Sequence, residues 1–437
     1  MKKLSVLIVG LILVSLLGIS SLGNAKKITI SMSVWGMAWE DFLYTDVIIP
    51  QYEKENPNVD VKFYRYENYW EKLTVLFAGG EAPDVMRNYL PFIGWHVRIG
   101  MAAPLDKYIK GPDGLDLNDF FSIPFKSMSY LDHIYMIPAG INSHNVLYYN
   151  KDLFDKAGVG YPNPNWTWDD LVAAGKKLTG RGKYGFLWAI PEYMFESLVN
   201  NLGGTIWDKT KQRCVVDSPT AIKAIKMMQK WIFDDKIVPK VGPGQIRTSS
   251  YAMFMGGRLA MITEGGWACP AFKRDAPQLN FARTTIPRAT PDSKPINSAG
   301  GTGWIMNSTT KYPKESWKLL KALVSHEGLL TYWRRTWVEV PARKSVLNDP
   351  RFRNIIGIGK KVPGIKTEEE FNEKAQPLID IVKNGWFTQE YAGSYYNYFA
   401  PFVTQALGQL IGVKRGDPEK VLKKLAADVN AAIEKGK

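Results

Sequence analysis

The sequence predicts an α/β protein in which strands and helices alternate along the chain. Two observations support this class. The chain has 437 residues, of which 45% are hydrophobic and 22% charged, an ordinary globular composition long enough for two or more domains. Strand-like and helix-like segments also follow one another from residue 28 onward. Such an order favours mainly parallel sheets that are covered by helices.

The first segments justify this reading one by one. Residues 28–34 have the β-branched and small residues of a strand, a helix passes through 48–52, and a second strand covers 59–64. Apolar residues recur at helical spacing over 66–77, and Gly79 with Gly80 ends that helix. Residues 84–86 and 134–137 are expected to form further short strands.

Later helices are marked by the residues that begin them. Thr167 is the predicted N-cap of a helix that ends at Gly180, and Asp170 three residues on completes a capping box. Ser218 followed by Pro219 begins another helix. The last helix, opened by an Asp-Pro pair, is predicted to turn four residues inward: Val421, Leu425, Val429 and Ala432.

The first 25 residues have the features of a secretory signal peptide. Lys2 and Lys3 precede an apolar run over 4–19, and the small residues Gly23 and Ala25 form a cleavage site. An uncleaved membrane anchor is the alternative, but the run is short for a hydrocarbon layer of about 30 Å. No cysteine lies near residue 25, so no lipid anchor is expected. The mature chain is therefore predicted to be exported to the periplasm or the cell exterior.

A second charge-free stretch covers residues 391–413. It contains five residues that are poorly suited to a membrane span: Asn397, Pro401, Thr404, Gln405 and Gln409. A partly buried helix in a soluble lobe is predicted instead.

No common catalytic or metal motif is present. The four histidines form no HExxH pattern, the two cysteines form no Cys-x-x-Cys, and neither a G-x-S-x-G elbow nor a P-loop occurs. Neighbouring carboxylates such as Glu40 and Asp41 fit a solvated helix start better than the acid and base of a glycosidase. Cys214 and Cys269 can form one disulfide at most, and whether they pair stays open. We therefore expect no catalytic residue, no metal and no cofactor.

Charge and aromatic content point to a different kind of site. The formal charge is +14, but basic residues are dispersed and form no stripe for a phosphate backbone, so no nucleic-acid partner is expected. The chain has 15 Trp, 21 Tyr and 19 Phe, which is more than a core readily absorbs. Some of these rings are expected to line a surface that binds a flat, partly apolar ligand.

Several phrases together resemble one family. The chain is similar to the extracellular solute-binding proteins of ABC sugar importers, the family that includes maltose-binding protein. The similarity begins at the strand ending in Trp35 and covers nearly the whole mature chain. The other matching phrases occur in family order: IIPQYEKENPNVDVKF, FAGGEAPDV, GMAAPLDKYI, YMIPAGINSHNVLYYNKDLFDKAGV, WTWDDLVAAGKKLT, AMFMGGRLAMITEGGW, GGTGWIMNSTT and VPARKSV.

The resemblance implies two α/β lobes, each with a mainly parallel sheet, joined by three crossing segments near 139–143, 297–301 and 340–345. One lobe would contain residues 26–140 plus 300–341, and the other 142–298 plus 345–437. The ligand would lie in the cleft between the lobes, which close by a few-residue change at a hinge. Gly140, Gly300 and Gly301 are suited to that change.

The resemblance also implies which residues contact the ligand. In the family, the Trp of the "AM…GW" phrase stacks on sugar, and Trp267 matches it. Asn88 takes a position where maltose-binding protein has Trp, which suggests a different sugar or a more polar subsite. The full expected set is Trp35, Trp39, Asn88, Asn142, Ser143, His144, Glu264, Trp267, Trp304 and Trp337. Other tryptophans are read as core: Trp166, Trp168, Trp231 and Trp317.

The implied function is binding without chemistry. The protein would be a monomer that carries an oligosaccharide to the permease subunits of an ABC transporter. An acidic oligosaccharide of the uronate type is an open alternative, which Arg334, Arg335 and Arg343 permit. An exported glycosidase or lyase is a third reading, for which no carboxylate pair or base can be assigned. The identity, length and linkage of the sugar stay open.

Overall fold

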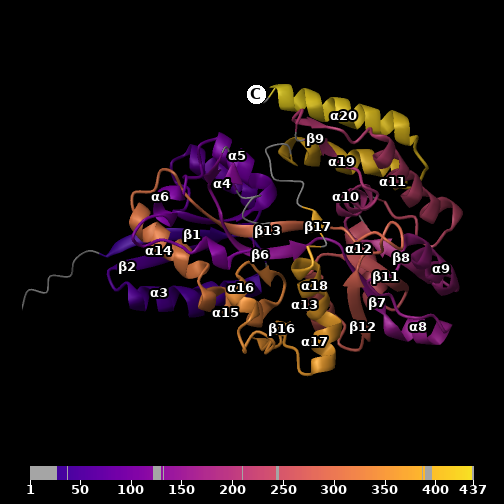
Figure 1. The fold of residues 1–437 in the computed structure, drawn as a ribbon, viewed down its shortest axis with the longest axis horizontal. Helices are drawn as coiled ribbons and strands as arrows, with labels where there is room; N and C mark the ends of the chain where they lie inside the picture. The colour runs from indigo at the N-terminus through magenta and orange to yellow at the C-terminus, as the bar shows by residue number, and fades with distance from the viewer. Residues whose placement is uncertain are drawn as a thin grey trace, which may run out of the picture.

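A computed structural model describes residues 27–36, 38–121, 129–130, 132–208, 210–242, 246–385, 387–388 and 396–435. The predicted signal peptide over 1–25 lies outside these residues. Two separate sheets, each flanked by helices, form two lobes (Figure 1). The sheet with β1, β2, β3, β6 and β13 lies on the left of this view, and the sheet with β7, β8, β11 and β12 lies on the right. The predicted two-lobed α/β fold is confirmed.

The first sheet is mixed. Its strand order is β14 (Val340–Pro341), β6 (Ile137–Ser143), β13 (Asn297–Met306), β3 (Val85–Tyr89), β1 (Ile28–Val34) and β2 (Val59–Arg65), with β17 (Phe387–Thr388) paired to β13. Strand β1 is parallel to β2 and β3, but β13 is antiparallel to both β3 and β6. The expectation of a mainly parallel sheet is wrong here, because β13 enters the middle of the sheet in the opposite direction.

The second sheet is mixed as well. Its order is β12 (Phe281–Thr285), β7 (Val146–Asn150), β11 (Leu259–Glu264) and β8 (Tyr184–Trp188). Only β11 and β8 are parallel among the described pairs, whereas β7 is antiparallel to β11 and to β12. Helices of this lobe include α8 (Lys151–Ala157), α9 (Trp168–Leu178), α10 (Pro191–Asn201), α11 (Pro219–Gln229), α12 (Ile246–Met255), α19 (Tyr396–Ile411) and α20 (Pro418–Lys435).

The remaining helices cover the first sheet or lie between the sheets. Around the first sheet are α3 (Ile49–Glu55), α4 (Tyr69–Ala78), α5 (Ile93–Arg98), α6 (Asp106–Ile109), α14 (Pro313–Leu323), α15 (His326–Thr336) and α16 (Lys344–Leu347). Three helices lie near the middle of the molecule: α13 (Ala268–Asp275), α17 (Glu368–Lys374) and α18 (Gln376–Lys383). Helix α18 contacts β12 of one sheet and β6 and β14 of the other.

The chain passes between the sheets near the predicted crossings. Strand β6 of the first sheet ends at Ser143, and β7 of the second sheet begins at Val146. Strand β12 of the second sheet ends at Thr285, and β13 of the first begins at Asn297. The exact division of residues into lobes stays a prediction.

Most local signals hold and a few shift. The capping box of Thr167 and Asp170 is present, with the Thr167 backbone N–H donating to the Asp170 carboxylate at 2.8 Å. The helix predicted over 66–77 begins only at Tyr69, because Asn68 adopts a left-handed φ of 46°. The strand predicted over 134–137 is divided between β5 (His133–Ile134) and β6. The buried face of α20 is also rotated from the predicted one and consists of Pro418, Leu422, Leu425, Ala426, Val429 and Ile433.

The core accounts for many of the aromatic residues. Trp168, Trp231 and Trp317 are buried as predicted, and Trp166 is partly buried against the core. Both cysteines are buried free thiols, so they form no disulfide, and burial raises the pKa of Cys214 to about 12. No helix among the described residues is both long and apolar enough to cross a membrane. This holds also for α19, the helix that forms within the charge-free stretch.

Candidate functional site

The site begins where two parallel strands of the second sheet end. Strand β8 lies parallel to β11, with Trp188 opposite Thr263, so the carboxyl ends of both strands meet at one edge. In open α/β sheets this edge is where ligands bind. Residues 189–192 follow β8, Glu264 is the last residue of β11, and residues 265–267 follow it, so both connections lie at this edge.

Trp267 lies directly after this edge and precedes α13. Its ring rests against the backbone of Gly265, where a Cβ atom would come within 2.3 Å of three ring carbons. Gly265 is therefore required for this placement of the indole. The ring is partly buried, and its Nε1 has no hydrogen-bond partner among the described residues. Trp267 thus offers an aromatic face, while its buried indole N–H lies toward Glu264 and opposes the rise that burial causes in the pKa of that carboxyl.

Glu264 is fully buried beside Trp267. Its Oε1 accepts the Gly265 N–H at 2.7 Å, and its Oε2 lies 3.6 Å from Nε of Arg247, an ion pair without a hydrogen bond. Burial raises the pKa of Glu264, and the positive charge of Arg247 opposes this shift. Arg247 itself has a side chain that is 55% exposed, so it forms the solvent side of this pair.

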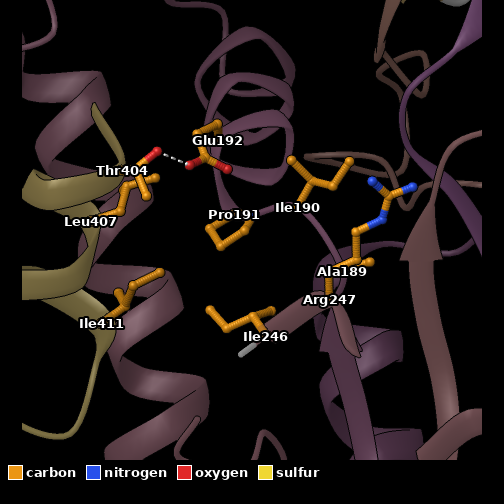
Figure 2. A pocket seen from close by; sticks show the side chains of 9 residues that line it. All are labelled: Ala189, Ile190, Pro191, Glu192, Ile246, Arg247, Thr404, Leu407 and Ile411. Carbon is orange, nitrogen blue, oxygen red and sulfur yellow. Dashed lines mark hydrogen bonds between the residues drawn. The ribbon is translucent and has the colours of Figure 1, made fainter. Parts of the chain in front are cut away.

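A cavity of about 260 Å³ continues from Arg247 along the end of β8. In Figure 2, Arg247 lies on one side of the cavity, and on the other side Thr404 of α19 donates a hydrogen bond to Glu192 of α10 at 2.6 Å. The apolar part of the lining consists of Ala189, Ile190, Pro191, Ile246, Leu407 and Ile411. The cavity therefore combines an apolar wall with three polar side chains.

The first crossing segment packs against the loop that holds Trp267. The Gly266 N–H donates to the Ser143 carbonyl oxygen at 2.9 Å, which ties β6 to this loop. Asn142 is 8% exposed, and its Oδ1 has no hydrogen-bond partner among the described residues. The expected residues Asn142, Ser143, Glu264 and Trp267 are therefore brought together in the structure.

Trp39 and Trp35 come from the first lobe. Trp39 and Trp267 are distant in sequence, yet both pack against the same small apolar cluster, formed by Leu43, Tyr332 and Val338. Trp35 lies just after β1, and its ring contacts those of Tyr69 and Trp70 at centroid distances of 5.4 and 4.9 Å. Both expected tryptophans are partly buried, so each keeps some exposed surface.

His144 has both ring nitrogens engaged by the protein. Its Nε2 lies 2.7 Å from the Tyr89 hydroxyl, and its Nδ1 lies 3.3 Å from Oγ of Ser298. One face of the ring stacks on Tyr193 with a centroid distance of 4.3 Å. Burial lowers the pKa of His144 to about 3, so the ring is neutral. The expectation of a direct polar contact from His144 to ligand does not fit this arrangement.

Asn88 is committed to the protein in a similar way. It is fully buried, its Nδ2 lies 2.8 Å from Nδ1 of His96, and its Oδ1 accepts the Tyr89 N–H at 2.8 Å. The expected ligand contact at Asn88 does not fit this arrangement, whereas Tyr89, the next residue along β3, is only partly buried. The alternation of side chains along a strand is the signal that could have found it, because neighbouring residues face opposite sides.

Trp304 and Trp337 lie in the packed interior. Trp304 is 3% exposed and meets Tyr44 edge-on at 5.9 Å. Trp337 is fully buried, and its indole N–H donates to the Pro363 carbonyl oxygen at 3.1 Å. The expectation that these two rings contact a ligand does not fit this arrangement, because both rings are buried against other residues.

The sequence did not lead us to expect the buried charge cluster formed by Arg87, Glu40 and Glu339. Arg87 of β3 faces Glu40 at 3.5 Å and Glu339 at 3.3 Å, and it donates to the Tyr332 hydroxyl at 2.9 Å. Glu339 also accepts a hydrogen bond from the Thr302 hydroxyl at 2.7 Å, which connects the second and third crossings. Burial raises the pKa of Glu40, and the charge of Arg87 opposes this shift. The sequence feature that indicates such a cluster is Arg87 itself, a charged residue within the otherwise mostly apolar strand β3.

The two lobes and a site at strand ends between them define a ligand-binding protein of the two-lobed class. The chain belongs to the bacterial extracellular solute-binding protein family, whose pattern matches residues 39–329.

Relatives and solved structures cover almost the whole chain. A putative binding protein of Brucella abortus is 25% identical over 96% of this chain and 97% of the relative. The arabinooligosaccharide-binding protein of Halalkalibacterium halodurans is 23% identical over 90% of this chain and 87% of the relative. An ABC substrate-binding protein of Listeria monocytogenes in complex with cycloalternan has a TM-score of 0.78 at 22% identity, covering 93% of this chain and 99% of that one. A maltose-bound protein of T. maritima has a TM-score of 0.74 at 20% identity, covering 93% and 100%.

Proposed function

We propose that this protein is an extracytoplasmic oligosaccharide-binding protein that delivers its ligand to an ABC importer and catalyses no reaction. The observation that carries the proposal is Trp267, whose partly exposed ring lies at the strand edge between the lobes. Binding by relatives supports the ligand class, since one is an arabinooligosaccharide-binding protein and another is a multiple sugar-binding protein.

The chemistry of the unused atoms fits a sugar. A sugar offers C–H faces to an aromatic ring and hydroxyl groups to polar atoms on its rim. Asn142 Oδ1 and Glu264 Oε2 can accept hydrogen bonds and Trp267 Nε1 can donate one, but all three atoms are buried, so a ligand would reach them only when the lobes open. A buried polar atom without a partner costs about 1–3 kcal/mol, so a polyol that satisfies all three gains affinity. We propose Trp35, Trp39, Asn142, Ser143, Glu264 and Trp267 as the contact set.

A neutral sugar fits the charges better than an acidic one. Two arginines near the described site already face carboxylates, Arg247 with Glu264 and Arg87 with Glu40 and Glu339. The buried Arg283, which donates to the Gly266 carbonyl oxygen at 3.1 Å, forms no ion pair among the described residues. A uronate would have to compete with these buried carboxylates for Arg247 and Arg87, although not for Arg283. A neutral sugar has no such competitor, because its hydroxyl groups can bind charged and uncharged partners alike.

Delivery requires export and closure of the lobes. We propose that export removes residues 1–25 and that the monomer closes over its ligand at the three crossings, with the lobes divided as 26–140 plus 300–341 and 142–298 plus 345–437. Closed protein would then dock on the permease subunits of the importer. N-terminal sequencing of the exported protein should begin at Lys26, and a product that begins at Met1 would contradict the export step.

A binding screen tests the proposal. Thermal unfolding is measured with maltotriose, cellotriose, xylotriose, arabinotriose and trigalacturonate at millimolar concentration. A ligand at 100 times its dissociation constant stabilises the folded protein by about 2.7 kcal/mol, which gives a clear shift. Chromatography of the same mixtures should show no shorter or unsaturated sugar. Absence of any shift would refute sugar binding for this panel, and release of product would favour the glycosidase or lyase reading.

A further inference from the structure

A chain of hydrogen bonds crosses the junction of the lobes at His144. Tyr89 ends β3 of the first sheet, and its hydroxyl lies 2.7 Å from His144 Nε2. On the other side of the ring, His144 Nδ1 lies 3.3 Å from Oγ of Ser298, which donates to Oε2 of Glu196 at 2.8 Å. Glu196 belongs to α10 of the second lobe and is fully buried. The chain therefore joins the two lobes through two crossing segments.

With the Glu196 carboxyl ionised, the donors fix the direction of this chain. The single hydroxyl proton of Ser298 is used toward Glu196, so Ser298 Oγ accepts from His144 and Nδ1 must carry a proton. A neutral imidazole has one N–H, so Nε2 is an acceptor. The Tyr89 hydroxyl is then the donor to Nε2. Burial keeps His144 neutral by lowering its pKa to about 3, so this direction holds through the neutral range.

A glycine at position 300 makes room for the contact between Tyr89 and His144. A Cβ on Gly300 would lie 2.5 Å from Cε2 of Tyr89 and 2.8 Å from Nε2 of His144, so glycine is needed where β13 passes the pair. Tyr89 lies at the same edge of the first sheet as Trp35, because β3 and β1 are parallel and both residues follow their buried parts. This edge faces ligands in open α/β sheets.

We infer that His144 is a positioning residue for Tyr89. Ser298 and Glu196 hold the His144 ring so that its Nε2 accepts a hydrogen bond from the Tyr89 hydroxyl. The Tyr89 oxygen is then oriented to accept a hydrogen bond from a ligand hydroxyl. The inference rests on the proposed function for the nature of the ligand. A group that meets the Tyr89 oxygen must donate, so Tyr89 selects a free hydroxyl over an ether or deoxy carbon at that point of the sugar.

The first test needs no ligand. Protein labelled with ¹⁵N-histidine contains four histidines, and imidazole nitrogen shifts report which nitrogen of each ring is protonated. His144 should show the Nδ1–H form, unchanged from pH 5 to pH 8. Ser298→Ala removes the acceptor of Nδ1 and should shift His144 toward a mixture of the two forms. An Nε2–H or protonated His144 in the unaltered protein would overturn the inference whatever the ligand proves to be.

The second test measures affinity for the panel sugar that binds most tightly. Tyr89→Phe deletes one hydroxyl and should weaken binding about five-fold, the value of one hydrogen bond of ordinary strength. Ser298→Ala should weaken it several-fold, although Ser298 and Tyr89 hold opposite sides of the ring. Because both act through His144, the double variant should bind no more weakly than Tyr89→Phe alone.

Controls separate the alternatives. Tyr161→Phe removes a hydroxyl that bonds Asp155 on the surface, so it should leave affinity unchanged. Additive losses in the double variant, or unchanged affinity in Tyr89→Phe, would overturn the inference. If no panel sugar binds the unaltered protein, the proposed function fails for the panel, while the nitrogen shifts still decide the direction of the hydrogen-bond chain.

Discussion

Replacing Trp267 with Ala separates ligand stacking from core packing. The indole is partly buried, rests on Gly265 and packs against the apolar cluster that Trp39 also contacts. Its Nε1 has no protein partner among the described residues. If the ring stacks on sugar, the substitution removes both the aromatic face and the donor that the ligand uses.

The structure sets the size of both effects. A stacked ring is worth about 1 kcal/mol and a hydrogen bond about 1 kcal/mol, so the loss in binding should be about 2 kcal/mol, roughly thirty-fold in affinity. Complete burial of Trp makes its loss cost about 3–5 kcal/mol of stability, and the partial burial of Trp267 reduces this to about 2 kcal/mol. Trp267→Phe keeps a ring but loses the N–H, so it should weaken binding only about five-fold.

Titration calorimetry and urea unfolding on the same variants measure the two effects. Trp166→Ala is the matched control, because Trp166 is also partly buried but lies away from the strand edge, before α9. It should lower stability and leave affinity unchanged. Near-normal affinity in Trp267→Ala together with a stability loss like that of the control would refute the assignment and place Trp267 in the core.

Three further results are expected. Gly140→Ala should cost about 1–3 kcal/mol of stability by urea unfolding, because its Cβ would lie 2.5–2.7 Å from Glu339, whereas Gly160→Ala, with no atom within 4 Å, should cost little. Burial lowers the pKa of His96 to about 4, so stability from this group is present above pH 6.5 and falls by about 2 kcal/mol by pH 5. His96→Gln should remove that part of the pH dependence and His133→Gln, at an exposed position, should retain it; equal slopes would contradict the assignment. Both cysteines should resist a thiol reagent in folded protein and react in denaturant, and rapid reaction of either in folded protein would contradict its burial.

Local signals in the sequence were sufficient for much of the secondary structure. Thr167 and Asp170 are three residues apart, so the capping box they form needs no distant partner. Strand direction could not be found in this way. Strand β13 pairs with β3 and β6, which lie more than 150 residues earlier, and its antiparallel entry depends on how the chain returns from the second lobe. The resemblance supplied the two lobes, but alternation of elements alone suggested parallel sheets.

Two of the expected site residues could be placed from the sequence, and their contact with a ligand stays a prediction. Trp267 and Glu264 follow a strand whose phrase could be matched, so their place at the strand edge was readable. The roles of Asn88 and His144 depend on His96 and Tyr89, which fold against them and use their polar atoms. A polar residue at a ligand-binding position therefore does not indicate whether its hydrogen-bonding groups remain available. Only the arrangement of its neighbours decides that.

The roles of the glycines in the crossings also depend on neighbouring side chains that the sequence alone does not identify. Gly140 and Gly300 were expected to permit a backbone change, yet neither has a positive φ. Each instead makes room for a side chain, Glu339 beside Gly140 and Tyr89 beside Gly300. Their identity is thus explained by close packing, which resists deformation. The closure proposed above would have to occur by rotation in the residues around these glycines if it keeps their contacts. Substitutions that fill either space should therefore destabilise the folded crossings before they change the freedom of a hinge.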